Sequence, residues 1–119
     1  TTRKTLVGTQ VPMARTLIVL RPMANLIGVY SRNLDTNYKI DASWLPNDGL
    51  VNVISARYPF TDAHEDYTAN AEPQTGKWYV MPTHEGDHGT VIGMQCTKRQ
   101  TLKFYYELTD LIESLPVTD

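Results

Sequence analysis

Residues 83–93 constrain the fold of this chain more than any other stretch. Their sequence, THEGDHGTVIG, holds two of the three histidines and three glycines, and Pro82 precedes it. Residues 84–88 also read H-E-x-x-H, a zinc-peptidase motif that needs a helix to place both imidazoles on one face. Each interior glycine costs a helix about 1 kcal/mol relative to alanine, so three cost roughly 3 kcal/mol. The glycines therefore favour a loop that carries a hydrolase histidine, whose aspartate partner lies elsewhere in the chain.

The composition as a whole argues against several classes of protein. A chain of 119 residues fits one domain or a piece of one. The net charge of −2, without a long run of either sign, gives no indication of nucleic acid or an anionic membrane as a partner. Residues 12–30 are the most apolar, but Arg15, Arg21 and Pro22 interrupt them, so we expect no transmembrane segment. Because the chain opens with Thr-Thr-Arg-Lys, we expect a processed or excised piece of a longer sequence.

The hydrophobic pattern predicts few regular elements. We expect the tail of a strand over residues 1–10, followed by two short buried helices over 12–30 that meet at Pro22 and end at Gly28. A short buried segment is expected over 50–54. Residues 57–76 are expected to form a surface loop with a solvated His64, and residues 77–81 a strand. A capping box at Thr97 and apolar residues at helical spacing predict a last helix, which Pro116 stops. These elements do not make a closed core. They are typical of the last third of an α/β domain.

Two further blocks of sequence, taken with the histidine loop, resemble a known family. Residues 44–55 read WLPNDGLVNVIS, 76–78 read GKW, 86–88 read GDH and 91–93 read VIG. In this order they resemble the C-terminal part of the staphylococcal and thermoalkalophilic bacillary lipases, which are true lipases of the α/β-hydrolase fold. Residues 28–30 and 40–43 are similar as well. The resemblance implies that Asp48 and His88 are the second and third members of a Ser-Asp-His triad. It also implies that residues 1–119 are the C-terminal segment of one α/β-hydrolase domain.

The residue types support this assignment independently. In α/β-hydrolases the triad runs Ser, Asp or Glu, His along the chain, and an aspartate on an Asn-Asp-Gly turn followed by a histidine on a glycine-rich loop is the second half of that order. The carboxylate would hold the imidazole tautomer and stabilise the imidazolium. We expect Gly86 and Gly89 to let the backbone bend, and Asp87 to be structural, accepting hydrogen bonds from the loop.

The chain departs from the family in two respects. It contains no small-x-Ser-x-Gly elbow, and the family's nucleophile, oxyanion hole, lid and zinc-binding insert all lie upstream. The bacillary members also bind calcium just after the catalytic histidine, where this chain has Thr90, Gln95 and Cys96. Neutral and sulfur groups are poor ligands for calcium. We therefore expect this chain to supply no metal or cofactor ligand, and the calcium site to be lost or replaced by hydrogen bonds.

The sequence thus predicts part of a secreted lipase or carboxylic-ester hydrolase, with the parent polypeptide and an ester or lipid as its partners. Asp48 and His88 would be the acid and the base, and the isolated chain is expected to be inactive because the nucleophilic serine is absent. Two alternatives stay open: a non-catalytic packing or interaction module, and then a zinc peptidase at residues 84–88.

Overall fold

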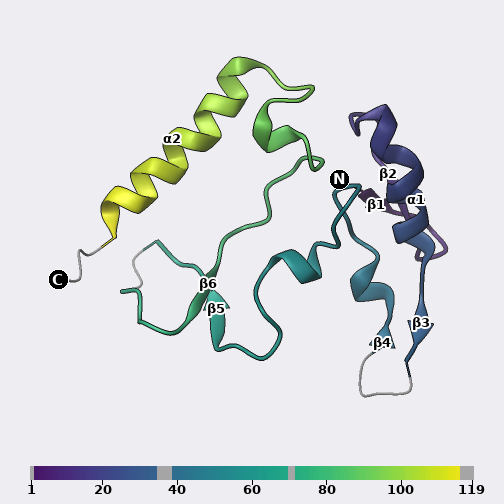
Figure 1. Ribbon diagram of the computed structural model, residues 1–119, viewed down its shortest axis with the longest axis horizontal. Helices are drawn as coiled ribbons and strands as arrows, with labels where there is room; N and C mark the ends of the chain where they lie inside the picture. Colours follow the sequence, from purple (N-terminus) through teal and green to yellow (C-terminus); the bar gives the residue numbers. More distant parts are fainter. Residues whose placement is uncertain (1, 35–38, 70–71, 116–119) are drawn as a thin grey trace.

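The chain consists of short strands, a long C-terminal helix, shorter helices and long connections (Figure 1). A computed structural model describes residues 2–34, 39–69 and 72–115. Its strands and helices follow in the order β1 Thr2–Lys4, β2 Gln10–Pro12, α1 Arg21–Val29, β3 Arg32–Asn33, β4 Lys39–Ile40, β5 His64–Asp66, β6 Trp78–Val80 and α2 Lys98–Ser114. Short 3-10 helices lie at Ile18–Leu20, Ala42–Trp44, Ile54–Ala56 and Thr90–Ile92. The described part is therefore mixed in strand and helix content, without a large sheet.

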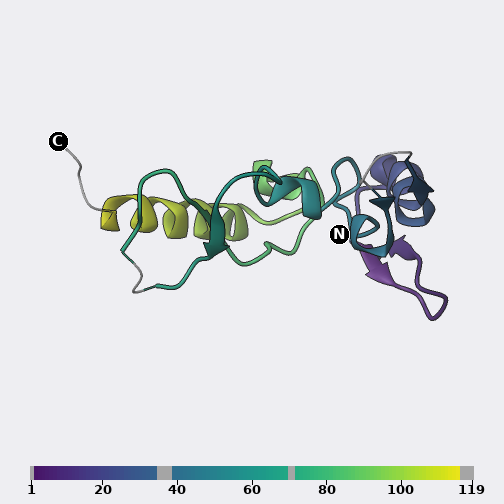
Figure 2. The same ribbon diagram turned by 90° about the horizontal axis from the view of Figure 1, so that it is seen from below.

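The molecule is flat and open rather than packed around its own core. Its extents are 48 × 41 × 22 Å, and Figure 2 shows the thin edge, with the β1–β2 hairpin and α1 at one end and α2 at the other. The radius of gyration is 16.7 Å, whereas a compact domain of this length has about 13.5 Å. Among the described residues, the buried hydrophobic side chains are Ala24, Leu45 and Val80. As the sequence predicts, these elements do not close a core.

The N-terminal hairpin packs against α1, and this part of the fold agrees with the prediction only in part. Strands β1 and β2 pair antiparallel, so residues 1–10 do not form a single strand tail. Helix α1 begins at Arg21, directly after the 3-10 helix Ile18–Leu20, so two short helices meet next to Pro22 as predicted, and the proline lies in the first turn of α1, which it suits. The helix does not end at Gly28 as predicted but continues through it. Gly28 is buried directly against the backbone of Gln10, so close that a Cβ at this position would overlap the carbonyl oxygen of Gln10. Most large apolar side chains of this region are exposed, so the prediction of buried helices is wrong for this chain.

In the middle of the chain, apolar side chains that were predicted to be buried are exposed, and one strand lies where a loop was predicted. Leu50 is 49% exposed and Val51 36%, because both follow directly on the turn at Asp48 instead of entering a core. Strand β6 lies where the sequence predicts a strand, and it pairs in parallel with β5, a polar strand inside the segment predicted to be loop. Polar side chains suit a strand at the edge of a small sheet, which is why the hydrophobic pattern did not reveal β5.

Helix α2 agrees with the prediction at its start. Thr97 and Gln100 form the complete capping box, each side chain bonding the backbone N–H of the other residue. The helix ends at Ser114 with Leu115 as its C-cap; Pro116, predicted to stop it, lies outside the described residues. Its Tyr and Leu stripe is exposed in this chain. No helix in the described residues has both the length and the apolar character needed to cross a membrane.

Candidate active site

The turn at residues 47–49 is held by a buried asparagine. Asn47 is 1% exposed, and its side-chain nitrogen donates to the carbonyl oxygens of Ala24 at 3.2 Å and Leu45 at 2.9 Å. Its side-chain oxygen accepts from the backbone N–H of Gly49 at 3.0 Å. Gly49 has a φ of +103°, a conformation that an L side chain rarely adopts. The turn is thus anchored to α1 from inside, which fixes the backbone from which the Asp48 side chain extends.

The carboxylate of Asp48 uses its two oxygens for different partners. Oδ1 accepts from the backbone N–H groups of Leu50 at 3.0 Å and Val51 at 2.8 Å, and Oδ2 lies 2.9 Å from Nδ1 of His88. Partial burial raises the pKa of Asp48, but these backbone donors and His88 outweigh it, so the pKa is lowered overall from its ordinary value. The side chain is therefore an anion, and only an acceptor, at neutral pH.

His88 is attached to Asp48 at two points. Besides the side-chain contact, the backbone N–H of His88 donates to the backbone carbonyl of Asp48 at 2.9 Å. Because the carboxylate can only accept, Nδ1 of the ring must carry the proton, and Nε2 of the neutral imidazole is then a base with a free lone pair. The His88 side chain is 49% exposed, and that of Asp48 32%. The geometry thus provides an oriented imidazole that a reacting group can reach.

The residue before His88 is held more tightly than His88 itself. Asp87 is 7% exposed. Its Oδ2 accepts from the backbone N–H of Leu17 at 2.7 Å, and its Oδ1 accepts from the N–H of Gly89 and the hydroxyl of Thr90, each at 3.0 Å. The prediction that Asp87 accepts hydrogen bonds from the loop is confirmed. The sequence did not indicate that one of the donors lies 70 positions away.

Gly86 lies at a bend of the backbone and Gly89 in a turn, as expected. Neither is among the glycines with positive φ, so their backbone angles do not themselves require glycine, and what the two residues provide is space. A Cβ on Gly86 would come within 2.7 Å of the Thr90 side chain, and one on Gly89 within 2.7 Å of Cδ1 of Leu17. The missing side chains let the histidine loop lie close against its own continuation and against residue 17.

The other two histidines are placed differently. Residues 83–87 contain no helix, so the arrangement that a helical H-E-x-x-H motif needs is not formed. The ring of His84 packs on Phe104, with centroids 4.9 Å apart, while His88 faces Asp48. His64 is exposed, as predicted, and stacks on Tyr58 at 3.5 Å.

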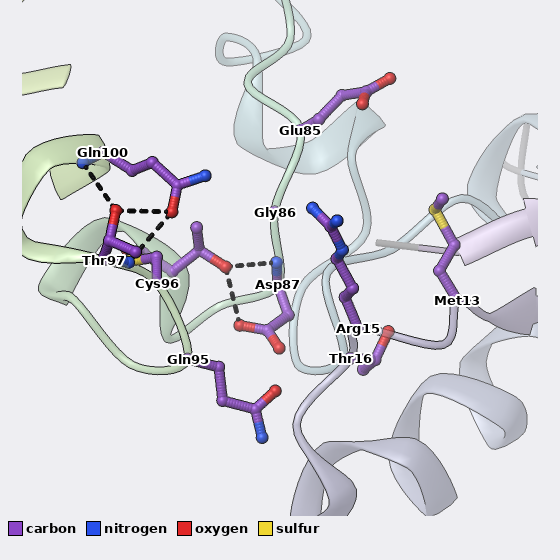
Figure 3. A pocket seen from close by; sticks show the side chains of 11 residues that line it. Met13, Arg15, Thr16, Glu85, Gly86, Asp87, Gln95, Cys96, Thr97 and Gln100 are labelled. Atoms are coloured by element: carbon purple, nitrogen blue, oxygen red, sulfur yellow. Dashed lines mark hydrogen bonds between the residues drawn. The ribbon is translucent and has the colours of Figure 1, made fainter. Parts of the chain in front are cut away.

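An open cavity of about 790 Å³ lies beside the loop, and its lining includes Thr90, Gln95 and Cys96, the positions at which the sequence led us to expect that calcium ligands are lost (Figure 3). The hydroxyl of Thr90 is used by Asp87, and the thiol of Cys96 lies 3.2 Å from the carbonyl of Thr90 and 3.1 Å from the hydroxyl of Thr101. Gln95, also on the lining, has a φ of +58°. Within the described ranges no three His, Cys, Asp or Glu side chains gather as a metal site. A hydroxyl and a thiol that already have protein partners do not fit calcium.

Sequence reasoning missed two groups that hold this site. Asn47 was recognised only as part of a turn, although an amide just before the aspartate, able to donate and accept, could have indicated an anchor. The backbone N–H of Leu17, which binds Asp87, gave no signal, since every residue other than proline has one.

Known proteins resemble this chain over most of its length. The profile of the family described as "Lipase-like, C-terminal domain" matches residues 1–119. The lipase of Staphylococcus hyicus is 36% identical over an alignment of 93 residues that covers 73% of this chain and 14% of that protein. The solved structure of Staphylococcus hyicus lipase superposes with a TM-score of 0.77 at 28% identity, covering 93% of this chain and 28% of the other. EstA from Clostridium botulinum superposes with a TM-score of 0.75 at 31% identity, covering 89% and 26%. The chain therefore spans less than a third of these proteins, and it belongs to the lipase-like C-terminal domain family.

Proposed function

We propose that this chain supplies the acid and the base of a lipase-type carboxylic-ester hydrolase, with Asp48 and His88 in those roles. The observation that carries the proposal is the contact of 2.9 Å between Oδ2 of Asp48 and Nδ1 of His88. The backbone bond between the same two residues and the two N–H groups on Oδ1 keep this contact in one geometry. A nucleophilic serine from the remainder of the parent polypeptide completes the triad.

In the proposed reaction His88 moves one proton in each direction. Its Nε2 takes the proton of the serine hydroxyl as the oxygen attacks the ester carbonyl, and the imidazolium then gives that proton to the leaving alcohol. The acyl-enzyme is hydrolysed in the same way, with water in place of serine. Asp48 stays ionised throughout, holding the Nδ1–H tautomer and stabilising the imidazolium. The lowered pKa of Asp48 suits that role, because the group remains charged across the neutral range.

The open shape supports the further proposal that residues 1–119 are one segment of a larger α/β-hydrolase domain. The accessible surface is 9374 Å², whereas a compact monomer of 13.5 kDa exposes about 6,500 Å². Roughly 2,900 Å² more than expected is therefore left uncovered, and the exposed apolar side chains of α1 and α2 belong to it. The upstream part of the parent would cover this surface. By its resemblance to staphylococcal lipases, we expect the parent to be secreted and to act on esters or lipids.

The same exposed surface would suit a packing module without catalysis, and replacement of single histidines separates the two functions. In the full-length parent, His88→Ala should reduce turnover of a p-nitrophenyl ester by at least about 10²–10⁴-fold, the contribution of a general base. His84→Ala and His64→Ala are the matched controls, since both rings are exposed and packed on an aromatic side chain. They should stay within a few-fold of wild type. Equal activity of all three variants would favour the packing module, and equal damage from His84→Ala would restore the zinc peptidase.

A further inference from the structure

We infer that Asp87 is a positioning residue, which ties the loop carrying His88 to residue 17 and so sets where the imidazole lies. The inference rests on the proposed function, because it assigns Asp87 a role in placing the base. Asp87 would act through the backbone on either side of His88, whereas Asp48 contacts the ring itself.

Three successive backbone N–H groups around His88 are all used in hydrogen bonds. The N–H of Asp87 donates to the hydroxyl of Thr90 at 2.9 Å, that of His88 to the carbonyl of Asp48 at 2.9 Å, and that of Gly89 to Oδ1 of Asp87 at 3.0 Å. Asp87 takes part in two of the three bonds, as donor in one and acceptor in the other. Figure 3 shows its carboxylate turned toward its own loop, beside the cavity. The backbone from which the ring extends is therefore held on both sides.

Asp87 also links this loop to a distant part of the chain. Its Oδ2 accepts from the N–H of Leu17 at 2.7 Å, the shortest of its hydrogen bonds. The Leu17 side chain also reaches the loop, since Cδ1 lies 2.7 Å from where a Cβ of Gly89 would stand. Leu17 precedes the 3-10 helix Ile18–Leu20 that leads into α1, the helix whose Ala24 carbonyl holds Asn47. Asp87 and Asn47 thus fix the base and the acid to the same N-terminal segment.

The burial of Asp87 makes the carboxylate difficult to replace. The side chain is 7% exposed, and its two oxygens accept three hydrogen bonds. An amide in the same place can keep an oxygen toward Gly89 and Thr90, but its NH₂ group then faces the N–H of Leu17, donor against donor. The link to residue 17 would open while the link within the loop is kept. Asp87→Asn is therefore a selective perturbation of the position of the loop.

The test compares Asp87→Asn with Asp110→Asn in the full-length parent. Both exchange a carboxylate for an amide, and Asp110 lies exposed on α2. Since a shift of about 1 Å in a reacting group can cost 10²-fold in rate, Asp87→Asn should lower kcat by about 10²-fold with KM within about twofold. Asp110→Asn should leave both unchanged. Thr90→Val, which removes the hydroxyl bonded to Asp87, should also lower kcat. This second variant tests the same inference if Asp87→Asn fails to fold.

Active-site titration separates positioning from a purely structural role. A fluorophosphonate, allowed to react to completion, counts the correctly folded sites, and kcat is then expressed per labelled site. A reduced kcat per site supports the inference. An unchanged kcat per site in Asp87→Asn and Thr90→Val, with all loss explained by fewer labelled sites, overturns it. If His88→Ala also keeps full activity, the proposed function itself has failed; if His88→Ala is inactive while Asp87→Asn keeps its kcat per site, only the positioning role has failed.

Discussion

Replacing Asp48 with asparagine exchanges one oxygen for an NH₂ group, and the surrounding hydrogen bonds decide which one. Oδ1 accepts from two backbone N–H groups, those of Leu50 and Val51, and these donors would repel an NH₂ group. The amide oxygen therefore takes the place of Oδ1, and the NH₂ group takes the place of Oδ2, opposite Nδ1 of His88. There it can only donate, so Nδ1 must lose its proton and the proton must move to Nε2. His88 then presents an N–H to the nucleophile instead of a lone pair.

The expected loss follows from this change of tautomer. In the serine-protease triad, exchange of the aspartate for asparagine leaves the geometry intact and lowers kcat by about 10⁴-fold. A loss of that size corresponds to roughly 5.4 kcal/mol of activation free energy. For Asp48→Asn we expect a loss of the same order in kcat, with little change in stability, because the turn keeps both backbone N–H bonds to the amide oxygen. Asp48→Ala removes those bonds as well, so it should also lower the melting temperature.

The assay is hydrolysis of a p-nitrophenyl ester by the full-length parent, with thermal unfolding measured on the same samples. Asp41→Asn is the matched control. Like Asp48, Asp41 accepts a hydrogen bond from the backbone N–H two residues ahead, that of Ser43, at 2.8 Å. It caps the 3-10 helix Ala42–Trp44, whereas the hydrogen bond to the ring of His88 comes from Asp48. The control should retain wild-type kcat. Activity of Asp48→Asn within about tenfold of wild type would refute the tautomer argument, since a wrongly protonated imidazole cannot accept the serine proton.

Three further outcomes are expected. Millimolar calcium should leave the melting temperature of the parent unchanged, because Thr90 and Cys96 are paired with protein groups; a ligand at 100 times its Kd stabilises by roughly 2.7 kcal/mol, so bound calcium would give a clear upward shift. The isolated chain of 119 residues should hydrolyse no p-nitrophenyl ester and unfold with poor cooperativity in calorimetry; turnover by the pure chain would contradict this. The pKa of Asp48 is lowered from 3.8, so its contribution to stability is complete above that value and is lost as the pH falls through the lower folded-state pKa. Urea midpoints of the parent between about pH 5 and pH 2 should accordingly fall less steeply in Asp48→Asn than in wild type, and identical slopes would speak against the lowered pKa.

The parts of this chain that could be predicted from sequence are those governed by local chemistry or by the resemblance to a known family. The capping box at Thr97 follows from the side chains of two residues three positions apart, and the structure confirms it. The contact between Asp48 and His88 joins residues 40 positions apart and is not local; it was predicted from the resemblance to the lipase family, with the order of a known triad as support, and it is present at 2.9 Å. The catalytic role of the pair stays a prediction.

Other features depend on surfaces and backbone groups that residue types do not reveal. Ile18 and Leu26 are apolar and were predicted to be buried, yet they are 72% and 59% exposed. Hydrophobicity indicates that a side chain favours burial, but it does not say whether the covering surface comes from the same stretch of chain. The bond between Leu17 and Asp87 could not be predicted either, because a backbone N–H has no sequence signature.

The long separation between Leu17 and Asp87 has a consequence for how the protein is made. Ribosomes add about 5–20 residues per second, so roughly 4–14 seconds pass between synthesis of residue 17 and synthesis of the residue 70 positions later that binds it. Through most of that time the turn at Asp48 can already rest on α1, since Asn47 and Ala24 are only 23 positions apart. During this time the carboxylate of Asp48 has no imidazole partner, because His88 has not yet been synthesised. The acid side of the site can therefore form before the base is present, and the pair can come together only once residue 88 has been synthesised.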